Sequence, residues 1–379
     1  MIQDDNIIEE IDSETHDDYV DDDLYKIKSW GSDMSFREII TMYEEDELVK
    51  PEMQRHYVWD KVEASRFIDS LLLGLPVPSV FLANTKDSKK IIVDGYQRIM
   101  TVYDYVKEGI WREDGKVFKL SRSQKINPRW QGKAFTELES EYQRKIRSSL
   151  IHAIIFEQSH PNDDDTSLFQ VFERINTSGR SLTAQEIRNC VYQGVYNKFL
   201  LSINEEDTDW RDLYGTEAPD KRMTDVELIL RYFALQDPEV WRMETGRISL
   251  KKHLNLFMGK MAKSSEGYLD NKEEEFGAVT QYLNNIFGEY AFRRVLSDEI
   301  DEGPKKRFVP TLFDSISIAT KQAIKNDVLN TNRIDMLNRR DRLLGDPDYE
   351  QYISIETTRV EHIHGRINLA YRYLYDKNA

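Results

Sequence analysis

The chain has 379 residues, of which 40% are hydrophobic and 32% are charged, so it can form a sizeable core and two domains. No apolar run is long enough to span a membrane, and the N-terminus has neither the basic nor the apolar region of a secretory signal. The single cysteine, Cys190, excludes an intrachain disulfide framework and a thiolate metal cage. We therefore expect a cytoplasmic protein that does not bind membranes.

The net charge of −16 is distributed unevenly along the chain. Residues 1–25 contain eleven acidic residues and no Lys or Arg, which leaves −5 for the rest of the chain. We interpret residues 1–23 as an acidic disordered tail. Residues 107–147, in contrast, contain eleven basic and six acidic residues. This basic segment is either a solvated face or a patch that binds DNA phosphates.

The first part of the chain alternates between short strands and capped helices. Residues 24–30 alternate as a strand does, and the capping box of Ser35 and Glu38 begins a helix that continues to about Glu45. A second box begins at Asp60, and its helix stops at Gly74. Strands are expected at 79–84, 90–94 and 150–158, and helices directly after Gly95 and around 139–149.

From about residue 160 onward the pattern is almost entirely helical. Capping boxes are expected at Thr183, Thr224 and Thr358, and long buried helices at 276–292 and 309–324. His362 and His364 fall about 200° apart on a helix, which favours a packing role over a shared metal. The sequence thus predicts an α+β domain over 24–200 and a mainly α-helical domain over 201–379.

The run Asp94-Gly95-Tyr96-Gln97-Arg98 lies where a predicted strand ends and a helix begins. Asp94 is a candidate helix cap, Gly95 permits a tight turn, and the first N–H groups of the helix form an anion site. Arg98 can hold a phosphate through its planar fork, Gln97 can orient a water, and Tyr96 offers a face for stacking on a base. The alternative is a capping Asp94 and a surface ion pair made by Arg98.

A second candidate site is the irregular segment 51–59, in which Gln54 and Arg55 lie among aromatic residues. Such a proline-anchored segment either lines a pocket or buries Trp59 in a core. The sequence has no phosphate-binding loop of the G-x-x-x-x-G-K-[ST] type, which excludes a P-loop NTPase.

Four motifs in order resemble the DUF262 family, which includes the N-terminal portion of the GmrS/GmrD modification-dependent restriction endonucleases. They read PEMQRHYVW (51–59), FIDSLLLGLPVPSVFL (67–82), IIVDGYQRIMTV (91–102) and FERINTSGRSLTAQEIRN (172–189). The resemblance covers roughly residues 35–200. It implies a ParB/sulfiredoxin-like α+β fold, nucleotide binding or hydrolysis, and a role in bacterial defence against phage or other foreign DNA.

The resemblance also implies site residues. Asp94, Gly95, Gln97 and Arg98 match the Asp-Gly-Gln-Gln-Arg motif of the family, and Tyr96 replaces its first Gln. The expected catalytic residues are Asp94, Gln97 and Arg98, with Asp94 also a ligand of Mg²⁺. The remaining expected nucleotide-binding residues are Gln54, Arg55, Asp69, Ser70, Gly95, Tyr96, Arg174, Asn176, Thr177 and Gly179.

Three functions follow from this resemblance. The leading one is binding, with hydrolysis, of a nucleoside triphosphate in DNA-linked defence, and the chain would then act on a partner nuclease. The second is a non-catalytic sensor or adaptor that recognises a nucleotide or modified DNA. The third is a stand-alone DNA nuclease that uses Asp94 and the basic segment. The sequence does not distinguish an NTPase from a binding protein, nor does it identify the nucleotide or the oligomeric state.

Overall fold

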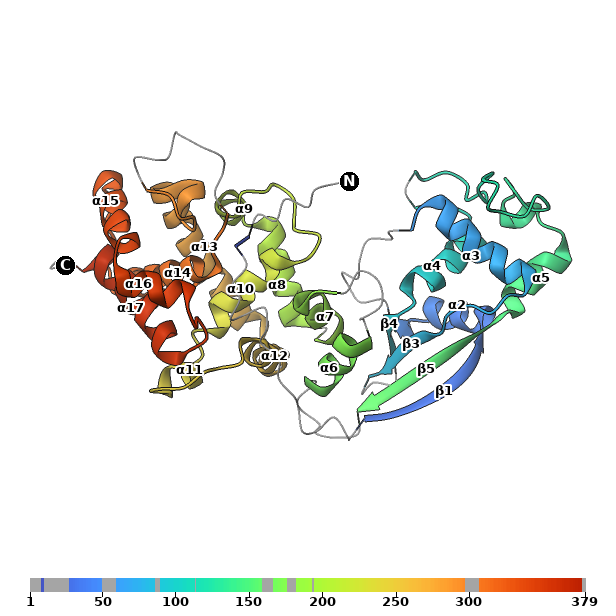
Figure 1. Ribbon diagram of the computed structural model, residues 1–379, viewed down its shortest axis with the longest axis horizontal. Coiled ribbons are helices and arrows are strands. Elements are labelled where there is room, and N and C mark those ends of the chain that lie inside the picture. Colours follow the sequence, from blue (N-terminus) through green and yellow to red (C-terminus); the bar gives the residue numbers. More distant parts are fainter. Residues whose placement is uncertain are drawn as a thin grey trace. The chain divides into compact units, whose positions relative to one another are not determined.

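The computed structural model describes residues 8–9, 27–49, 59–85, 89–112, 114–158, 166–175, 182–192, 194–296 and 307–376. The chain divides into two compact units (Figure 1). The sheet unit holds the described residues from 27 to 182 together with Asn189–Val191. The helical unit holds residues 8–9, Thr183–Arg188 and the described residues from Tyr192 onward. The units are therefore not contiguous in sequence, and the expected domain ranges 24–200 and 201–379 stay predictions.

The sheet unit is built on a mixed five-stranded sheet in the order β1-β5-β3-β4-β2. Strands β1 and β5 pair antiparallel, as do β3 and β4, whereas β3 pairs parallel with β5 and β2 pairs parallel with β4. The strands are β1 (Ile27–Ser35), β2 (Leu48–Val49), β3 (Val80–Asn84), β4 (Lys90–Asp94) and β5 (Leu150–Gln158). The strands expected at 79–84, 90–94 and 150–158 are confirmed, and residues 27–30 of the first expected strand lie in β1.

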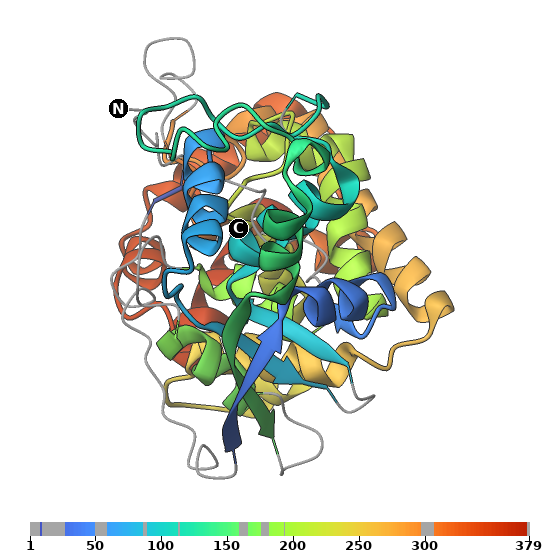
Figure 2. The same ribbon diagram turned by 90° about the vertical axis from the view of Figure 1, so that its right-hand side faces the viewer.

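Helices pack on one face of this sheet (Figures 1 and 2). In β5, Ile151, Ala153 and Ile155 are buried in the same core as the helix residues Phe36 and Ile68. Their spacing of two follows from the alternation of side chains along a strand. The helices of this unit are α2 (Phe36–Glu44), α3 (Lys61–Leu73), α4 (Tyr96–Tyr103), the π-helical turn η2 (Asp104–Glu108), the 3-10 turn η3 (Phe135–Glu137), α5 (Ser140–Ser148) and α6 (Thr166–Ile175).

Local capping signals account for where several of these helices begin. Ser35 accepts a hydrogen bond from the Glu38 backbone N–H at 3.2 Å, and the Asp60 carboxylate accepts from Val62 and Glu63 at 2.7 and 2.8 Å. The side chain of Glu63 in turn accepts from the Asp60 N–H at 3.0 Å, so the box is complete. These two expected caps are confirmed, and the end of α3 at a left-handed Gly74 is confirmed as well.

Beyond β5 every regular element of the described chain is a helix or a helical turn. These elements are α7 (Ala184–Val191), α8 (Val195–Glu206), α9 (Thr208–Tyr214), α10 (Thr224–Ala234), α11 (Pro238–Arg242), α12 (Leu250–Met261), α13 (Glu266–Phe287), η4 (Gly288–Tyr290), α14 (Pro310–Lys325), α15 (Arg333–Leu344), α16 (Pro347–Ser354) and α17 (Val360–Tyr375). An α+β domain followed by a helical region is therefore confirmed.

Two of the three expected capping boxes in the second part are wrong, and tertiary contacts explain both. The box at Thr183 forms, but α10 begins after Met223, which has a left-handed φ of 59° and makes no side-chain cap. The carboxylate of Glu227 instead accepts from the buried Arg188 at 2.7 Å. Thr358 lies outside α17 because its carbonyl accepts from Ile248 at 3.0 Å.

Helix α14 lies at the centre of the helical unit and carries a buried carboxylate. Asp314 accepts two hydrogen bonds from Arg231 of α10, at 3.1 and 2.5 Å, and one from Arg366 of α17 at 3.2 Å. All three side chains are buried. This ionic cluster joins three helices, and each partner compensates a charge that would otherwise be costly to bury.

A second buried cation, Arg340 of α15, is satisfied by backbone oxygens. Its guanidinium donates to the carbonyls of Tyr290, Ala291, Arg293 and Val295. Burial lowers the pKa of the Arg340 guanidinium to about 10. A single side chain thus fixes the irregular segment that follows η4.

The two histidines of α17 both contact backbone carbonyls. His362 Nδ1 lies 2.8 Å from the Ile355 oxygen, and His364 Nε2 lies 3.1 Å from the Val240 oxygen. The His364 ring also stacks on Trp241 at 4.5 Å between centroids. These contacts agree with the packing role expected for the pair. None of the described helices is both long and apolar enough to cross a membrane.

Candidate functional site

The turn between β4 and α4 depends on a glycine. Gly95 has a φ of 101°, which L side chains rarely adopt. A Cβ at this position would lie 2.3 Å from Cγ1 of Val80 in the neighbouring strand β3. The first backbone hydrogen bond of the helix runs from the Ile99 N–H to the Gly95 carbonyl at 3.0 Å. The N–H groups of Tyr96, Gln97 and Arg98 come before this bond at the start of the helix, and they are the groups that can attract an anion.

The expected cap made by Asp94 is wrong. Gly95 is the last residue before the helix and makes no side-chain cap, so Asp94 lies one position too early. Its carboxylate instead accepts from Arg98 Nη1 at 3.2 Å, and the same nitrogen donates to the Ser79 carbonyl at 2.7 Å. The Arg98 side chain is 19% exposed and that of Asp94 is 39% exposed.

The remaining donors of Arg98 are available. Within the described part of the chain, Nη2 and Nε of Arg98 have no hydrogen-bond partner, since both of its recorded bonds use Nη1. One nitrogen therefore anchors the guanidinium to the strand end, and the side chain as a whole stays partly exposed. A planar fork held in this way suits bidentate recognition of a phosphate or carboxylate.

Tyr96 is part of the core and not of an open surface. Its ring is 5% exposed, and its hydroxyl lies 3.5 Å from Nη1 of Arg112. Burial raises the pKa of the Tyr96 hydroxyl. Stacking of Tyr96 on a base, which the sequence predicts, would require the ring to leave this core.

Beneath Tyr96 lies an ion pair that the sequence reasoning missed. Arg112 binds the buried Asp104 carboxylate through both Nε and Nη2, and the latter distance is 2.7 Å. The hydrogen bonds and charge of Asp104 raise the pKa of the Arg112 guanidinium, although burial opposes them. The sequence does not reveal this ion pair, because a π-helical turn and an irregular segment separate Asp104 from Arg112 and no helical spacing links the two residues.

Gln97 lies at the half-buried start of α4. Its side-chain oxygen accepts from the Trp59 backbone N–H at 3.4 Å, a long contact. Its carbonyl accepts from the Thr101 hydroxyl at 2.6 Å. The amide is therefore close to the segment that precedes α3 as well as to the Gly95 turn.

The structure gives Asp69 and Ser70 contacts of their own in α3. The buried Asp69 carboxylate accepts from the Asn127 N–H at 3.1 Å and from Trp130 Nε1 at 2.5 Å. The Ser70 hydroxyl donates to the Arg66 carbonyl at 2.9 Å. Both residues thus have a packing role that requires no ligand, and their expected part in nucleotide binding stays a prediction.

The other expected nucleotide-binding residues are not assembled with the Gly95 turn by any described contact. Arg174 is exposed near the end of α6. The rest lie outside the described residues: Gln54, Arg55, Asn176, Thr177 and Gly179.

A metal would have few protein ligands at this turn. The described residues contain no group of three or more His, Cys, Asp or Glu side chains that could hold an ion. Asp94 offers one carboxylate, which is enough only for an ion that takes its other ligands from phosphates and water, as Mg²⁺ commonly does. Arg98 would then share the carboxylate with the ion.

The basic segment 107–147 contains two kinds of cation. Some are paired with carboxylates, such as Lys107 with Glu44 and Lys119 with Glu137, each at 2.7 Å. Others are exposed and form no ion pair with a described residue: Arg122, Lys125, Arg129, Arg144 and Lys145. The second group is the part of the segment that remains able to meet an external phosphate.

Comparison with known protein families gives a match for part of the chain. Residues 36–193 match the family model of the GmrSD restriction endonuclease, N-terminal domain. The match contains the Gly95 turn, α3 and the basic segment. Comparisons with curated proteins and with solved structures return no match. The ParB/sulfiredoxin-like relationship therefore stays a prediction. Residues 36–193, which are less than half of the chain, are thus similar to the N-terminal domain of the GmrSD restriction endonuclease, a family associated with restriction-type defence.

Proposed function

We propose that the chain binds a nucleoside triphosphate at the Gly95 turn, hydrolyses it, and uses this reaction in restriction-type defence. The observation that carries the proposal is the geometry of Arg98. One nitrogen is anchored by Ser79 and Asp94, and two are left to hold a ligand. The position of the turn, at the end of a strand and the start of a helix, adds N–H groups and a positive dipole end.

Each residue of the turn has a distinct part in this proposal. Arg98 holds phosphate oxygens, and the N–H groups at the start of α4 stabilise their charge. Gln97 orients the water that attacks the terminal phosphorus, and the nucleoside diphosphate leaves. Asp94 would hold Mg²⁺ together with the phosphates, and the ion would neutralise charge that develops on the transferred group. Gly95 allows the ligand to approach the backbone closely.

Replacing Arg98 tests the proposal directly. We expect Arg98→Ala to weaken nucleotide binding by about 10- to 100-fold, because a charge-assisted hydrogen bond contributes about 1.5–3 kcal/mol. Thermal shift and turnover would be measured across a panel of nucleoside triphosphates with Mg²⁺. Arg144→Ala, an exposed arginine on α5, is the matched control and should bind as the wild type does. Unchanged binding and turnover in Arg98→Ala would remove the assignment.

A second candidate function is a sensor that binds without hydrolysis. It is favoured by the engagement of Asp94, the one carboxylate of the turn, with Arg98. Asp94→Asn separates the two candidates, because it keeps a hydrogen-bond acceptor for Arg98 but loses the charge that a metal needs. Loss of turnover with retained binding supports hydrolysis, whereas tight binding with no product in the wild type selects the sensor.

The exposed cations of the basic segment supply the proposed contact with DNA. Affinity for DNA falls as salt rises, so a plot of log affinity against log salt has a negative slope. We expect Arg144→Ala/Lys145→Ala to make this slope shallower by about 1 for each phosphate contact removed. Binding of duplex DNA would be measured at several salt concentrations. Lys107→Ala is the control, because that ammonium group is already paired with Glu44. An unchanged slope in the double variant would place the DNA contact elsewhere.

A further inference from the structure

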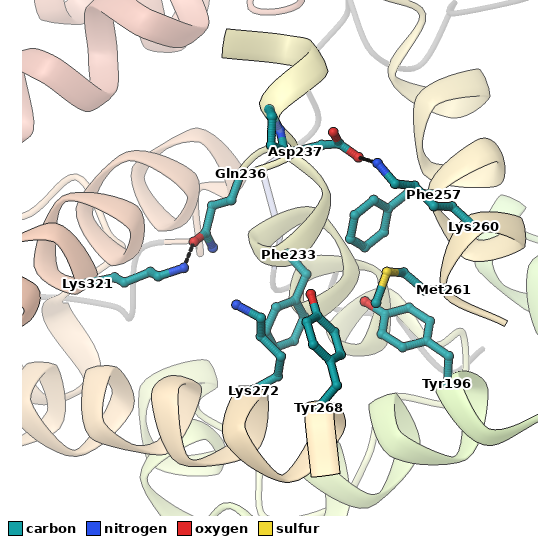
Figure 3. A pocket seen from close by; sticks show the side chains of 11 residues that line it. Tyr196, Phe233, Gln236, Asp237, Phe257, Lys260, Met261, Tyr268, Lys272 and Lys321 are labelled. Carbon is teal, nitrogen blue, oxygen red and sulfur yellow. Dashed lines mark hydrogen bonds and ion pairs between the residues drawn. The ribbon is translucent and has the colours of Figure 1, made fainter. Parts of the chain in front are cut away.

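The helical unit contains a pocket with a volume of about 230 Å³ between α8, α10, α12, α13 and α14 (Figure 3). Its inner wall consists of the buried side chains Tyr196, Phe233, Phe257 and Met261. Tyr196 and Phe257 meet edge to face at 6.0 Å between centroids. Walls of this kind favour a flat apolar group, because aromatic rings pack well on faces and edges of other rings.

One polar atom within this apolar wall lacks a partner. The Tyr196 side chain is 2% exposed, and its hydroxyl makes no hydrogen bond with any residue that the structure describes. The hydroxyl points into the pocket, toward Tyr268 (Figure 3). A buried hydroxyl without a partner costs folding free energy, so a ligand with a polar substituent at this depth would be favoured there.

Three lysines from three different helices line the pocket, with Lys272 and Lys321 on one side and Lys260 on the other (Figure 3). Lys260 pairs with Asp237 at 2.6 Å, and Lys321 and Lys272 share Glu275, at 2.6 and 3.2 Å. Lys321 also donates to the side-chain oxygen of Gln236. Three ammonium groups thus face two carboxylates, which leaves one positive charge for an external anion.

The two lysines that share Glu275 are the better candidates for that anion. Burial lowers the pKa of Lys321, and the charges of Lys272 and Lys325 lower it further, whereas the hydrogen bond that Lys321 donates to Glu275 opposes the shift. An added negative charge would relieve this repulsion. Each ammonium has three donors, and Lys321 uses two of them on Glu275 and Gln236, so each lysine can bind a further acceptor without breaking its pair with Glu275.

We infer that this pocket binds a small planar aromatic acid. The ring lies among Tyr196, Phe233 and Phe257, a polar ring substituent meets the Tyr196 hydroxyl, and the acid group meets Lys272 and Lys321. The volume is below the roughly 300–1,000 Å³ of pockets for drug-sized ligands, which excludes a dinucleotide or a longer chain. An aromatic carboxylate and a pyrimidine nucleoside monophosphate share the required chemistry.

Calorimetric titration of the full chain with defined probes tests this inference. 4-Hydroxybenzoate and uridine monophosphate represent the carboxylate and the phosphate source, and cyclohexanecarboxylate is the non-planar control. We expect one of the two aromatic acids to bind saturably and the control not to bind. Failure of both aromatic acids at millimolar concentration would overturn the inference.

Two variants then locate the binding. Tyr196→Phe keeps the ring and should lower the affinity for 4-hydroxybenzoate or uridine monophosphate by about tenfold. The affinity for unsubstituted benzoate should be unchanged. Lys321→Met should reduce binding of either acid by at least the same factor, whereas Arg333→Met at the exposed start of α15 should not. Wild-type affinity in both Tyr196→Phe and Lys321→Met would contradict the proposed site.

The pocket and the Gly95 turn can be tested separately. Arg98→Ala should leave binding of the aromatic acid unchanged, and Tyr196→Phe should leave nucleoside triphosphate turnover unchanged. Loss of acid binding in Arg98→Ala would show that the probe occupies the Gly95 turn, and this result would overturn the inference.

Discussion

Asp314→Ala should lower the free energy of unfolding by about 3–5 kcal/mol, because it leaves two buried arginines without their shared carboxylate. Arg231 and Arg366 both contact Asp314, and all three side chains are buried. The bidentate contact with Arg231 is lost entirely, although the guanidinium stays in a buried position. Urea denaturation of the full chain, followed by circular dichroism, measures the change.

Two further variants separate the ionic cluster from a general effect of charge. Glu44→Ala removes the partner of Lys107 on the surface and should cost less than about 1 kcal/mol. The triple variant Arg231→Met/Asp314→Leu/Arg366→Met removes every charge of the cluster and should recover most of the lost stability. A cost below about 1 kcal/mol for Asp314→Ala would show that the cluster does not stabilise the helical unit.

Gly95→Ala should destabilise the sheet unit by about 2–5 kcal/mol and abolish nucleotide binding. A left-handed φ costs an L residue about 1–2 kcal/mol, and overpacking against a neighbour adds about 1–3 kcal/mol. The added Cβ would lie 2.3 Å from Val80, so either β3 or the start of α4 must shift. Both changes displace Arg98, since its anchor is the Ser79 carbonyl beside β3.

Gly109→Ala is the matched control for the backbone contribution. Gly109 has a φ of 65°, and a Cβ there would meet no atom within 4 Å. The free energy of unfolding of this variant should fall by only about 1–2 kcal/mol, and its nucleotide binding should be unchanged. Equal losses in the two variants, measured by thermal unfolding and nucleotide titration, would show that contact with Val80 is unimportant.

The features that the sequence predicted well are those that depend on residues close together in the chain. The boxes at Asp60 and Thr183 depend on residues three positions apart and both form, whereas at Ser35 the expected cap on the Glu38 N–H forms without the reciprocal bond to the Glu38 side chain. The box expected at Thr224 does not form because Glu227 is engaged by Arg188, which lies 39 residues away in the chain. A capping pattern competes with partners that only the tertiary fold brings near, and no local rule can exclude them.

The candidate site shows the same limit. The strand, the glycine turn and the helix after Gly95 are one continuous segment, so their order could be predicted from 17 or so residues of pattern. The Ser79 anchor of Arg98 and the Trp130 contact of Asp69 join segments 19 and 61 residues apart. Asp69 belongs to a motif that resembles a family, yet its hydrogen bonds with Asn127 and Trp130 give it a structural role that its local sequence does not reveal.

Arg340 has a consequence for the dynamics of the helical unit. The four carbonyls that it binds belong to residues 290–295, which form no strand and only the end of a short 3-10 turn. One guanidinium on α15 thus holds four backbone carbonyls of this segment, in addition to the backbone hydrogen bonds that the segment makes within itself and with Val309. The amide protons of these residues should therefore exchange with solvent as one group, in a cooperative opening that follows the release of one side chain.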